Sequence, residues 1–118
     1  MATIKSYSDL QQSKKLAEIL PVETADMQWF LEEDYGIVQI KEEPQDWGGD
    51  CTIPCWSLAA LLEILDYPQL SKDKLGSGKE GWMVSVYPND CRYDSCWQDN
   101  PIDACVEMII RLNELKLL

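Results

Sequence analysis

The sequence predicts a single α+β domain covering residues 1–118, with its elements in the order α-ββ-α-ββ-α. The length of 118 residues fits one domain, and an apolar content of 46% is enough for one core. Stretches with helical spacing of apolar residues alternate with short runs of strand formers. We therefore expect an antiparallel sheet of about four strands with the helices packed on one face.

The first helix is predicted from a start signal and a stop signal. Residues 8–11 have the form of a capping box, with Ser8 as the cap and Gln11 as its partner. Pro21 ends the helix, because proline restricts the preceding residue and has no amide donor. The apolar stripe between these signals consists of Leu10, Leu16, Ala17 and Leu20.

A hairpin and a second helix are predicted next. Residues 27–31 and 37–40 are rich in strand formers, and the polar connector between them ends in Gly36. Residues 44–50 carry the loop signals proline and paired glycines. A helix is then predicted over residues 54–65. Apolar residues surround most of it, so we expect it to be the most buried element.

The remaining chain predicts a second hairpin and a third helix. After a glycine-rich break at 76–78, apolar and polar residues alternate over 82–87, as in a half-buried strand. A turn at 88–90 leads to a weaker strand over 93–97. Asn100 and Pro101 then form a cap and a first-turn proline that open a helix to about Lys116. Its predicted core face is Ile102, Cys105, Val106, Ile109 and Leu112.

Two further patterns concern the third helix and the arrangement of the whole chain. Glu107 and Arg111 are spaced to pair on the outer side of the third helix. The second and third helices both follow a hairpin and open with proline, which hints at a duplicated ββα unit. Residue identity between the two halves is poor.

The negative charge is concentrated in one part of the chain. The net charge is −11, and the segment from Glu23 to Asp66 holds 11 acidic residues against one base, Lys41. Two interpretations remain open: a solvated surface that keeps the protein soluble, or a docking face for a partner protein with a basic surface. Direct nucleic-acid binding is not expected, because phosphate contacts require clustered lysine and arginine.

The residue types exclude much catalytic chemistry. The chain contains no histidine, which rules out His-based nucleophile triads and His-ligated zinc or haem. Two cysteine pairs, Cys51 with Cys55 and Cys91 with Cys96, lack the two-residue gaps typical of four-cysteine zinc sites. We expect free thiols, no metal and no cofactor. Cys55 and Cys105 are expected in helix cores. No catalytic residues are predicted.

A candidate binding surface lies on the acidic hairpin and the loop after it. Its residues are Glu32, Glu33, Asp34, Glu42, Glu43, Asp46, Trp47 and Asp50. Aromatic side chains are favoured at binding surfaces because they bury much area at little entropic cost. Trp47 has two readings: an anchor for a partner, or a lid that folds back onto the core.

Two observations bear on where the protein acts. The first residues lack the apolar stretch of a signal peptide, and no segment is apolar over a membrane-spanning length, so a cytoplasmic protein without membrane contact is expected. Residues 7–21, 54–62 (PCWSLAALL) and 100–108 (NPIDACVEM) resemble small uncharacterised proteins of gut bacteria, some of them carried on prophage or other mobile elements. The resemblance implies a bacterial, phage-related origin and no particular activity.

Three functional hypotheses follow from the sequence. The leading one is a non-enzymatic protein–protein interaction through the acidic hairpin and the Trp47 loop. The second is an acidic DNA mimic that inhibits a nucleic-acid-binding enzyme, with carboxylates in place of phosphates. The third is a small enzyme of unidentified class, which would show a pocket where several carboxylates converge.

Overall fold

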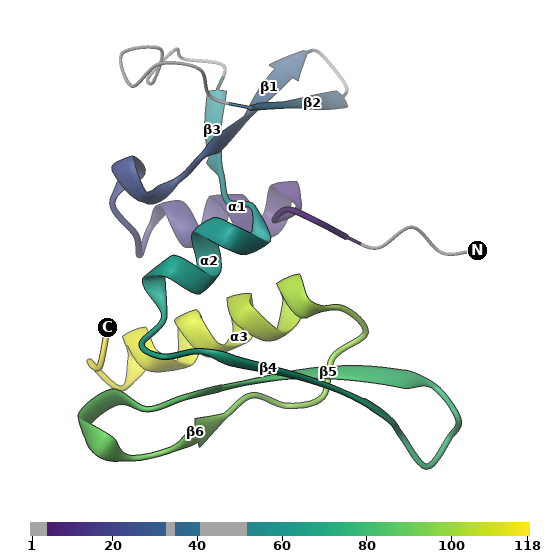
Figure 1. Ribbon diagram of the computed structural model, residues 1–118. Helices are drawn as coiled ribbons and strands as arrows, with labels where there is room; N and C mark the ends of the chain where they lie inside the picture. The colour runs from purple at the N-terminus through teal and green to yellow at the C-terminus, as the bar shows by residue number, and fades with distance from the viewer. Residues whose placement is uncertain (1–4, 33–34, 41–51) are drawn as a thin grey trace.

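The computed structural model describes residues 5–32, 35–40 and 52–118, and these form an α+β fold. Three α-helices lie between two sheets, as Figure 1 shows. Each sheet is antiparallel and has three strands, in the orders β2-β1-β3 and β4-β5-β6. The prediction of one sheet of about four strands was therefore wrong, because each hairpin gains its own third strand instead of joining the other.

The first helix, α1 (Leu10–Ala17), begins one residue later than predicted. Its N-cap is Asp9, whose carboxylate accepts from the Gln12 amide at 2.8 Å, while the Gln12 side chain accepts from the Asp9 amide at 3.0 Å. The capping box is thus present, but Asp9 and Gln12 form it instead of Ser8 and Gln11. Ser8 is unavailable as a cap because it is completely buried, where its hydroxyl accepts from the Trp56 amide.

The apolar stripe of α1 is only partly confirmed. Leu16 and Leu20 are buried, whereas Leu10 is partly exposed and Ala17 is exposed. The helix ends at Ala17, before the stop predicted at Pro21, and a short 3-10 helix over Val22–Thr24 then leads into the first sheet.

The predicted first hairpin is confirmed as β1 (Met27–Glu32) and β2 (Tyr35–Ile40). The sequence missed β3 (Thr52–Cys55), which pairs with the other side of β1. Pro54, expected to open a helix, lies inside this strand. The position tolerates a proline because β3 is at the edge of its sheet.

The second helix, α2 (Leu58–Ile64), begins after the N-cap Ser57, whose hydroxyl accepts from the Ala60 amide at 3.2 Å. Only Leu61 of this helix is fully buried. The expectation that it is the most buried element was therefore wrong. The helix is seven residues long, too short to turn several rows of side chains inward.

The second sheet contains β4 (Gln69–Lys74), β5 (Glu80–Val86) and β6 (Tyr93–Asp94), with a 3-10 turn at Pro88–Asp90. The predicted β5 is confirmed, and Val84 and Val86 are fully buried. Strand β6 is shorter than predicted. Strand β4 was not predicted, because its sequence QLSKDK lacks alternating apolar residues and it is stabilised by pairing with β5.

The third helix, α3 (Pro101–Glu114), is the centre of the core. Asn100 caps it as predicted, accepting from the Asp103 amide at 2.9 Å. All five residues of the predicted core face are buried, and Ala104 and Met108 are buried as well. The helix contacts β5, α2 and α1. None of the described helices is both long and apolar enough to cross a membrane.

The two sheets do not share a topology. The central strand of the first sheet, β1, is the first of its three strands in the chain, whereas the central strand of the second, β5, is the second of its three. The hint of a duplicated ββα unit is therefore wrong. The similar positions of Pro54 and Pro101 are misleading, because one lies in a strand and the other opens a helix.

The burial of α2 can be tested with two neighbouring leucines. Leu61 is fully buried and Leu62 only partly. Replacing Leu61 with alanine leaves a cavity, so Leu61→Ala should lower the free energy of unfolding by about 2–5 kcal/mol. Leu62→Ala is the matched control and should cost clearly less. Urea unfolding followed by tryptophan fluorescence measures both, and equal losses would contradict the packing of α2.

Candidate functional site

The predicted binding surface falls almost entirely outside the described residues. Glu32 ends β1, where it pairs through its backbone with Tyr35 of β2. The other members lie outside the described ranges: Glu33, Asp34, Glu42, Glu43, Asp46, Trp47 and Asp50. Their role stays a prediction, as does the choice between an anchor and a lid for Trp47.

The described strands on either side of these residues belong to one sheet. Strand β1 ends at Glu32, β2 runs from Tyr35 to Ile40, and β3 begins at Thr52. The described strands that flank both acidic stretches therefore belong to the sheet β2-β1-β3, which lies on the other side of the helices from β4-β5-β6 (Figure 1). The sequence did not predict β3, so it gave no sign that the second stretch returns to the same sheet.

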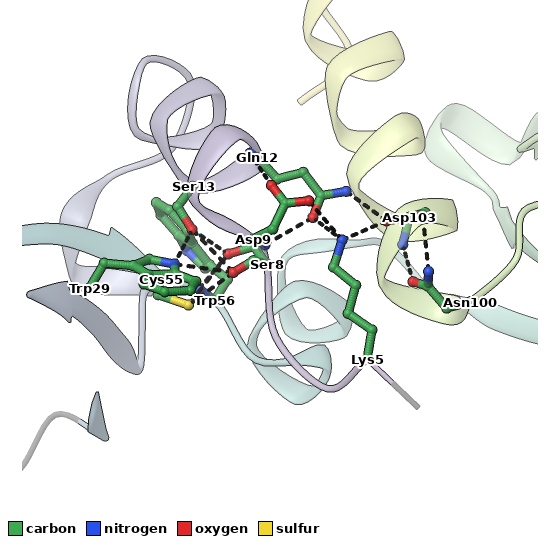
Figure 2. A network of polar contacts seen from close by, with 10 residues as sticks. All are labelled: Lys5, Ser8, Asp9, Gln12, Ser13, Trp29, Cys55, Trp56, Asn100 and Asp103. Carbon is green, nitrogen blue, oxygen red and sulfur yellow. Dashed lines mark hydrogen bonds and ion pairs between the residues drawn. The ribbon is translucent and has the colours of Figure 1, made fainter. Parts of the chain in front are cut away.

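The most developed polar cluster among the described residues joins α1 to α3. The Lys5 ammonium lies 2.9 Å from an Asp103 carboxylate oxygen, 3.0 Å from Asp9 and 2.7 Å from the Gln12 amide oxygen. Gln12 also donates to Asp103 at 2.7 Å. Figure 2 shows these side chains converging from the N-terminal segment and the first turns of two helices. One cation thus connects three parts of the chain.

The charges in this cluster stabilise each other. Burial opposes ionisation of Lys5, but hydrogen bonds and charge attraction from Asp103 and Asp9 outweigh it and raise the pKa of Lys5. Burial also opposes ionisation of Asp103, but hydrogen bonds from Lys5 and Gln12 outweigh it and lower the pKa of Asp103. Both groups are therefore charged at neutral pH, and Lys5 is not a general base.

A second cluster is built around two buried serines. The Ser8 and Ser13 hydroxyl oxygens are 2.7 Å apart, and both side chains are completely buried. The Trp29 indole donates to Ser13 at 3.1 Å, and the Cys55 thiol donates to the Ser8 carbonyl at 3.4 Å (Figure 2). This cluster fastens α1 to β1 and to the end of β3.

The serine cluster does not form a nucleophilic site. No histidine is available as a base, and neither hydroxyl is accessible to a substrate. Burial raises the pKa of the Cys55 thiol more than its hydrogen bonds to Ser8 and Ser13 lower it, so it stays protonated and unreactive. The hydrogen bonds of the serine cluster indicate a structural role, because they satisfy buried polar groups at the junction of α1 and the first sheet.

The four described cysteines have three different environments, and Cys51 lies outside the described residues. Cys105 lies in the core of α3 as predicted, and burial raises its pKa to about 12. Cys55 is buried but ends a strand, so its assignment to a helix core was wrong. Cys91 and Cys96 are exposed on the segment after β5. In the described part of the chain, no three cysteines or carboxylates are grouped to hold a metal ion.

The Glu107–Arg111 pair is confirmed at 2.8 Å, with a role that the sequence did not indicate. Glu107 accepts from the Cys96 amide at 2.9 Å, and Arg111 donates to the Asp94 carbonyl at 2.7 Å. The pair therefore holds the β6 segment against α3 instead of facing only solvent. Sequence spacing identified the partners, but it could not identify the backbone groups that they bind.

The Lys5–Asp103 bridge predicts a pH-dependent stability. The lowered pKa of Asp103 stabilises the fold above its ordinary pKa of about 4, and this contribution disappears as pH falls through the folded-state pKa. The raised pKa of Lys5 stabilises the fold below about pH 10 and is lost only at higher pH. Asp103→Asn should therefore cost about 1 kcal/mol at pH 7 and less at pH 3, where the contribution has begun to disappear.

Urea unfolding at the two pH values measures this difference. Asp99→Asn is the control, because Asp99 is an exposed acid just before the same helix and should have little effect at either pH. An equal loss for Asp103→Asn at pH 7 and pH 3 would show that its charge does not stabilise the junction.

Comparisons with known proteins add no functional information. The chain matches no family model, no curated protein and no solved structure. The resemblance of the helical segments to proteins of gut bacteria stays an expectation.

Proposed function

We propose that the protein is a non-enzymatic interaction protein that binds the basic surface of a partner protein through its acidic segment, in the cytoplasm of a bacterium. The observation that carries this proposal is the concentration of charge. Eleven acidic residues and a single base lie between Glu23 and Asp66, in a chain whose net charge is −11. A concentrated field of one sign speeds the encounter with an oppositely charged partner.

The first sheet supports the proposal by its position. Glu32 ends β1, and Asp34 and Glu42 flank β2 in the sequence, so all three are linked to one sheet, which contacts the rest of the described protein chiefly through α1.

The described polar clusters also favour binding over catalysis. Lys5 and Asp103 neutralise each other across a junction between helices. Ser8, Ser13 and Cys55 are buried and hydrogen-bonded to one another or to backbone. In the described ranges, the buried polar groups thus have structural partners, with one exception, the Gln28 side-chain oxygen.

A DNA mimic remains the second candidate, favoured by the same acidic segment. A mimic would need carboxylates without intervening apolar surface, and the first hairpin also carries Trp29. The Trp29 indole donates to Ser8 and Ser13, so its polar edge faces α1. A partner that releases its DNA on binding would identify a mimic. A small enzyme is the third candidate.

Charge reversal tests the acidic segment. Changing Glu42, Glu43 and Asp46 to lysine should leave the melting temperature unchanged or slightly raised, because it removes like-charge repulsion. The same change should abolish capture of a basic partner from a bacterial extract, chiefly by slowing association. Glu18, Asp99 and Glu114 are exposed acids outside the first sheet, and their triple lysine variant is the control. Equal capture by both variants would contradict the proposal.

Trp47→Ala distinguishes between the two hypotheses for Trp47, an anchor for a partner and a lid on the core. An anchor predicts faster dissociation of the complex with an unchanged melting temperature. A lid predicts a melting temperature several degrees lower, since truncating a buried indole costs on the order of 3 kcal/mol. Dissociation kinetics by surface plasmon resonance and a thermal melt of the free protein measure the two quantities. A variant that alters neither would exclude Trp47 from both roles.

A further inference from the structure

A groove at the opposite end of the molecule from the acidic hairpin has features of a side-chain pocket. It measures about 160 Å³ and lies where α2, the end of β5 and the end of α3 meet. In Figure 1 this is the side where the C-terminal residues and the turn after β5 approach each other. Its apolar lining consists of Ile64, Val86, Pro88, Leu112, Leu117 and Leu118. Asp66 is the one charged residue in the lining.

The walls of the groove are held by specific backbone bonds. The Leu117 amide donates to the Leu112 carbonyl at 2.8 Å, and the Lys116 amide donates to the Asn113 carbonyl at 3.1 Å. These two bonds form a Schellman motif that folds Leu117 back onto α3. On the opposite wall, the Tyr87 amide donates to the Asp66 carbonyl at 3.4 Å. The groove is therefore part of the fold and not a gap between loose segments.

Backbone strain in the described chain is concentrated around this groove. The non-glycine residues with positive φ are Tyr67 at 46°, Asn89 at 54°, Asp90 at 63° and Lys116 at 59°. Each directly adjoins a lining residue or follows one within two positions. Asparagine and aspartate tolerate this conformation, whereas tyrosine and lysine do so rarely. Strained residues of this kind gather at ligand-binding sites.

The lining residues determine which kind of chemical group the groove can bind. A purely apolar group would desolvate the Asp66 carboxylate without replacing its hydrogen bonds, and an acidic group would be repelled. Among the described residues, Asp66 forms no ion pair. An aliphatic stem that ends in a cation satisfies both parts of the lining. A cavity of about 150 Å³ accepts benzene, so this groove is large enough for one such side chain.

We propose that the groove binds an arginine side chain of the partner protein, with its methylene stem against the leucines and its guanidinium at Asp66. Tyr67 favours arginine over lysine, because it is 84% exposed beside Asp66 and a guanidinium stacks on aromatic rings. Asp90 follows the lining residue Pro88 by two positions in the sequence, and Lys116 precedes the lining residue Leu117. The inference rests on the proposed function in one respect, the basic surface of the partner.

A blocked tripeptide, acetyl-Gly-Arg-Gly-amide, tests the groove without the partner. Titrated into the ¹⁵N-labelled protein at low salt, it should shift the amide signals of residues 64–67, 86–90 and 112–118. The citrulline tripeptide, which has the same shape without the charge, should not. Asp66→Asn should weaken binding about two- to fivefold, as expected for a solvent-accessible ion pair. Asp99→Asn is the control and should bind like the wild type.

Three outcomes would overturn the inference: no shifts with arginine, equal shifts with citrulline, or shifts confined to residues 27–40. The lysine triple variant at Glu42, Glu43 and Asp46 changes no lining residue, so it should bind the tripeptide normally. If the tripeptide binds the groove while no basic partner is captured, the proposed function is contradicted but arginine binding in the groove is supported. If a basic partner is captured and Asp66→Asn changes neither tripeptide nor partner binding, only the inference that the groove binds arginine is contradicted.

Discussion

The structure depends on the burial of α3, which packs against β5, α2 and α1. A helix buried on several sides must be apolar around most of its circumference, and from Ile102 to Leu112 this one is. The second sheet and the other two helices take their positions from this contact. Apolar burial is the dominant favourable term in folding, so the packing of α3 fixes the rest of the framework.

The first sheet is attached in a different way, through polar contacts as well as apolar ones. Ser8 and Ser13 connect α1 to Trp29 of β1 and to Cys55 of β3. Trp56, fully buried, continues this junction toward Thr24 through its indole. Buried hydrogen bonds are costly to leave unmade, so they fix the geometry of the junction more sharply than apolar contacts do. The sheet that borders the acidic stretches is therefore held in a defined orientation.

Charge and shape are distributed unequally over the molecule. Most residues of the predicted binding surface flank strands of the first sheet in the sequence, whereas Asp66, the last residue of the acidic segment, lines the groove on the far side of the helices from that sheet. Both features favour a cationic partner, but they act by different physics. The acidic segment acts at a distance and depends on salt, whereas the groove acts only on contact and depends on fit. Their separation means that a partner using both would have to extend around the helical layer.

The sequence by itself determined the features that depend on neighbouring residues. The Asn100 cap, the β1–β2 hairpin, the alternation in β5 and the Glu107–Arg111 pair all arise from residues a few positions apart. The concentration of acidic charge is also a property of the sequence alone. The proposed binding roles of Glu33 and Glu42 rest on this charge, and that of Trp47 rests on its place in the acidic loop.

Only the tertiary structure decided the features that depend on distant contacts. Strand β4 is polar and forms by pairing with β5, and Pro54 joins a strand because β1 offers an edge. Ser8 lost its predicted place as a helix cap because the Trp56 amide, far along the chain, needs its hydroxyl. The groove at Asp66 assembles from three separate segments, so no local pattern marks it. Hydrogen bonding and burial between distant residues outweigh local preference wherever a buried polar group must find a partner.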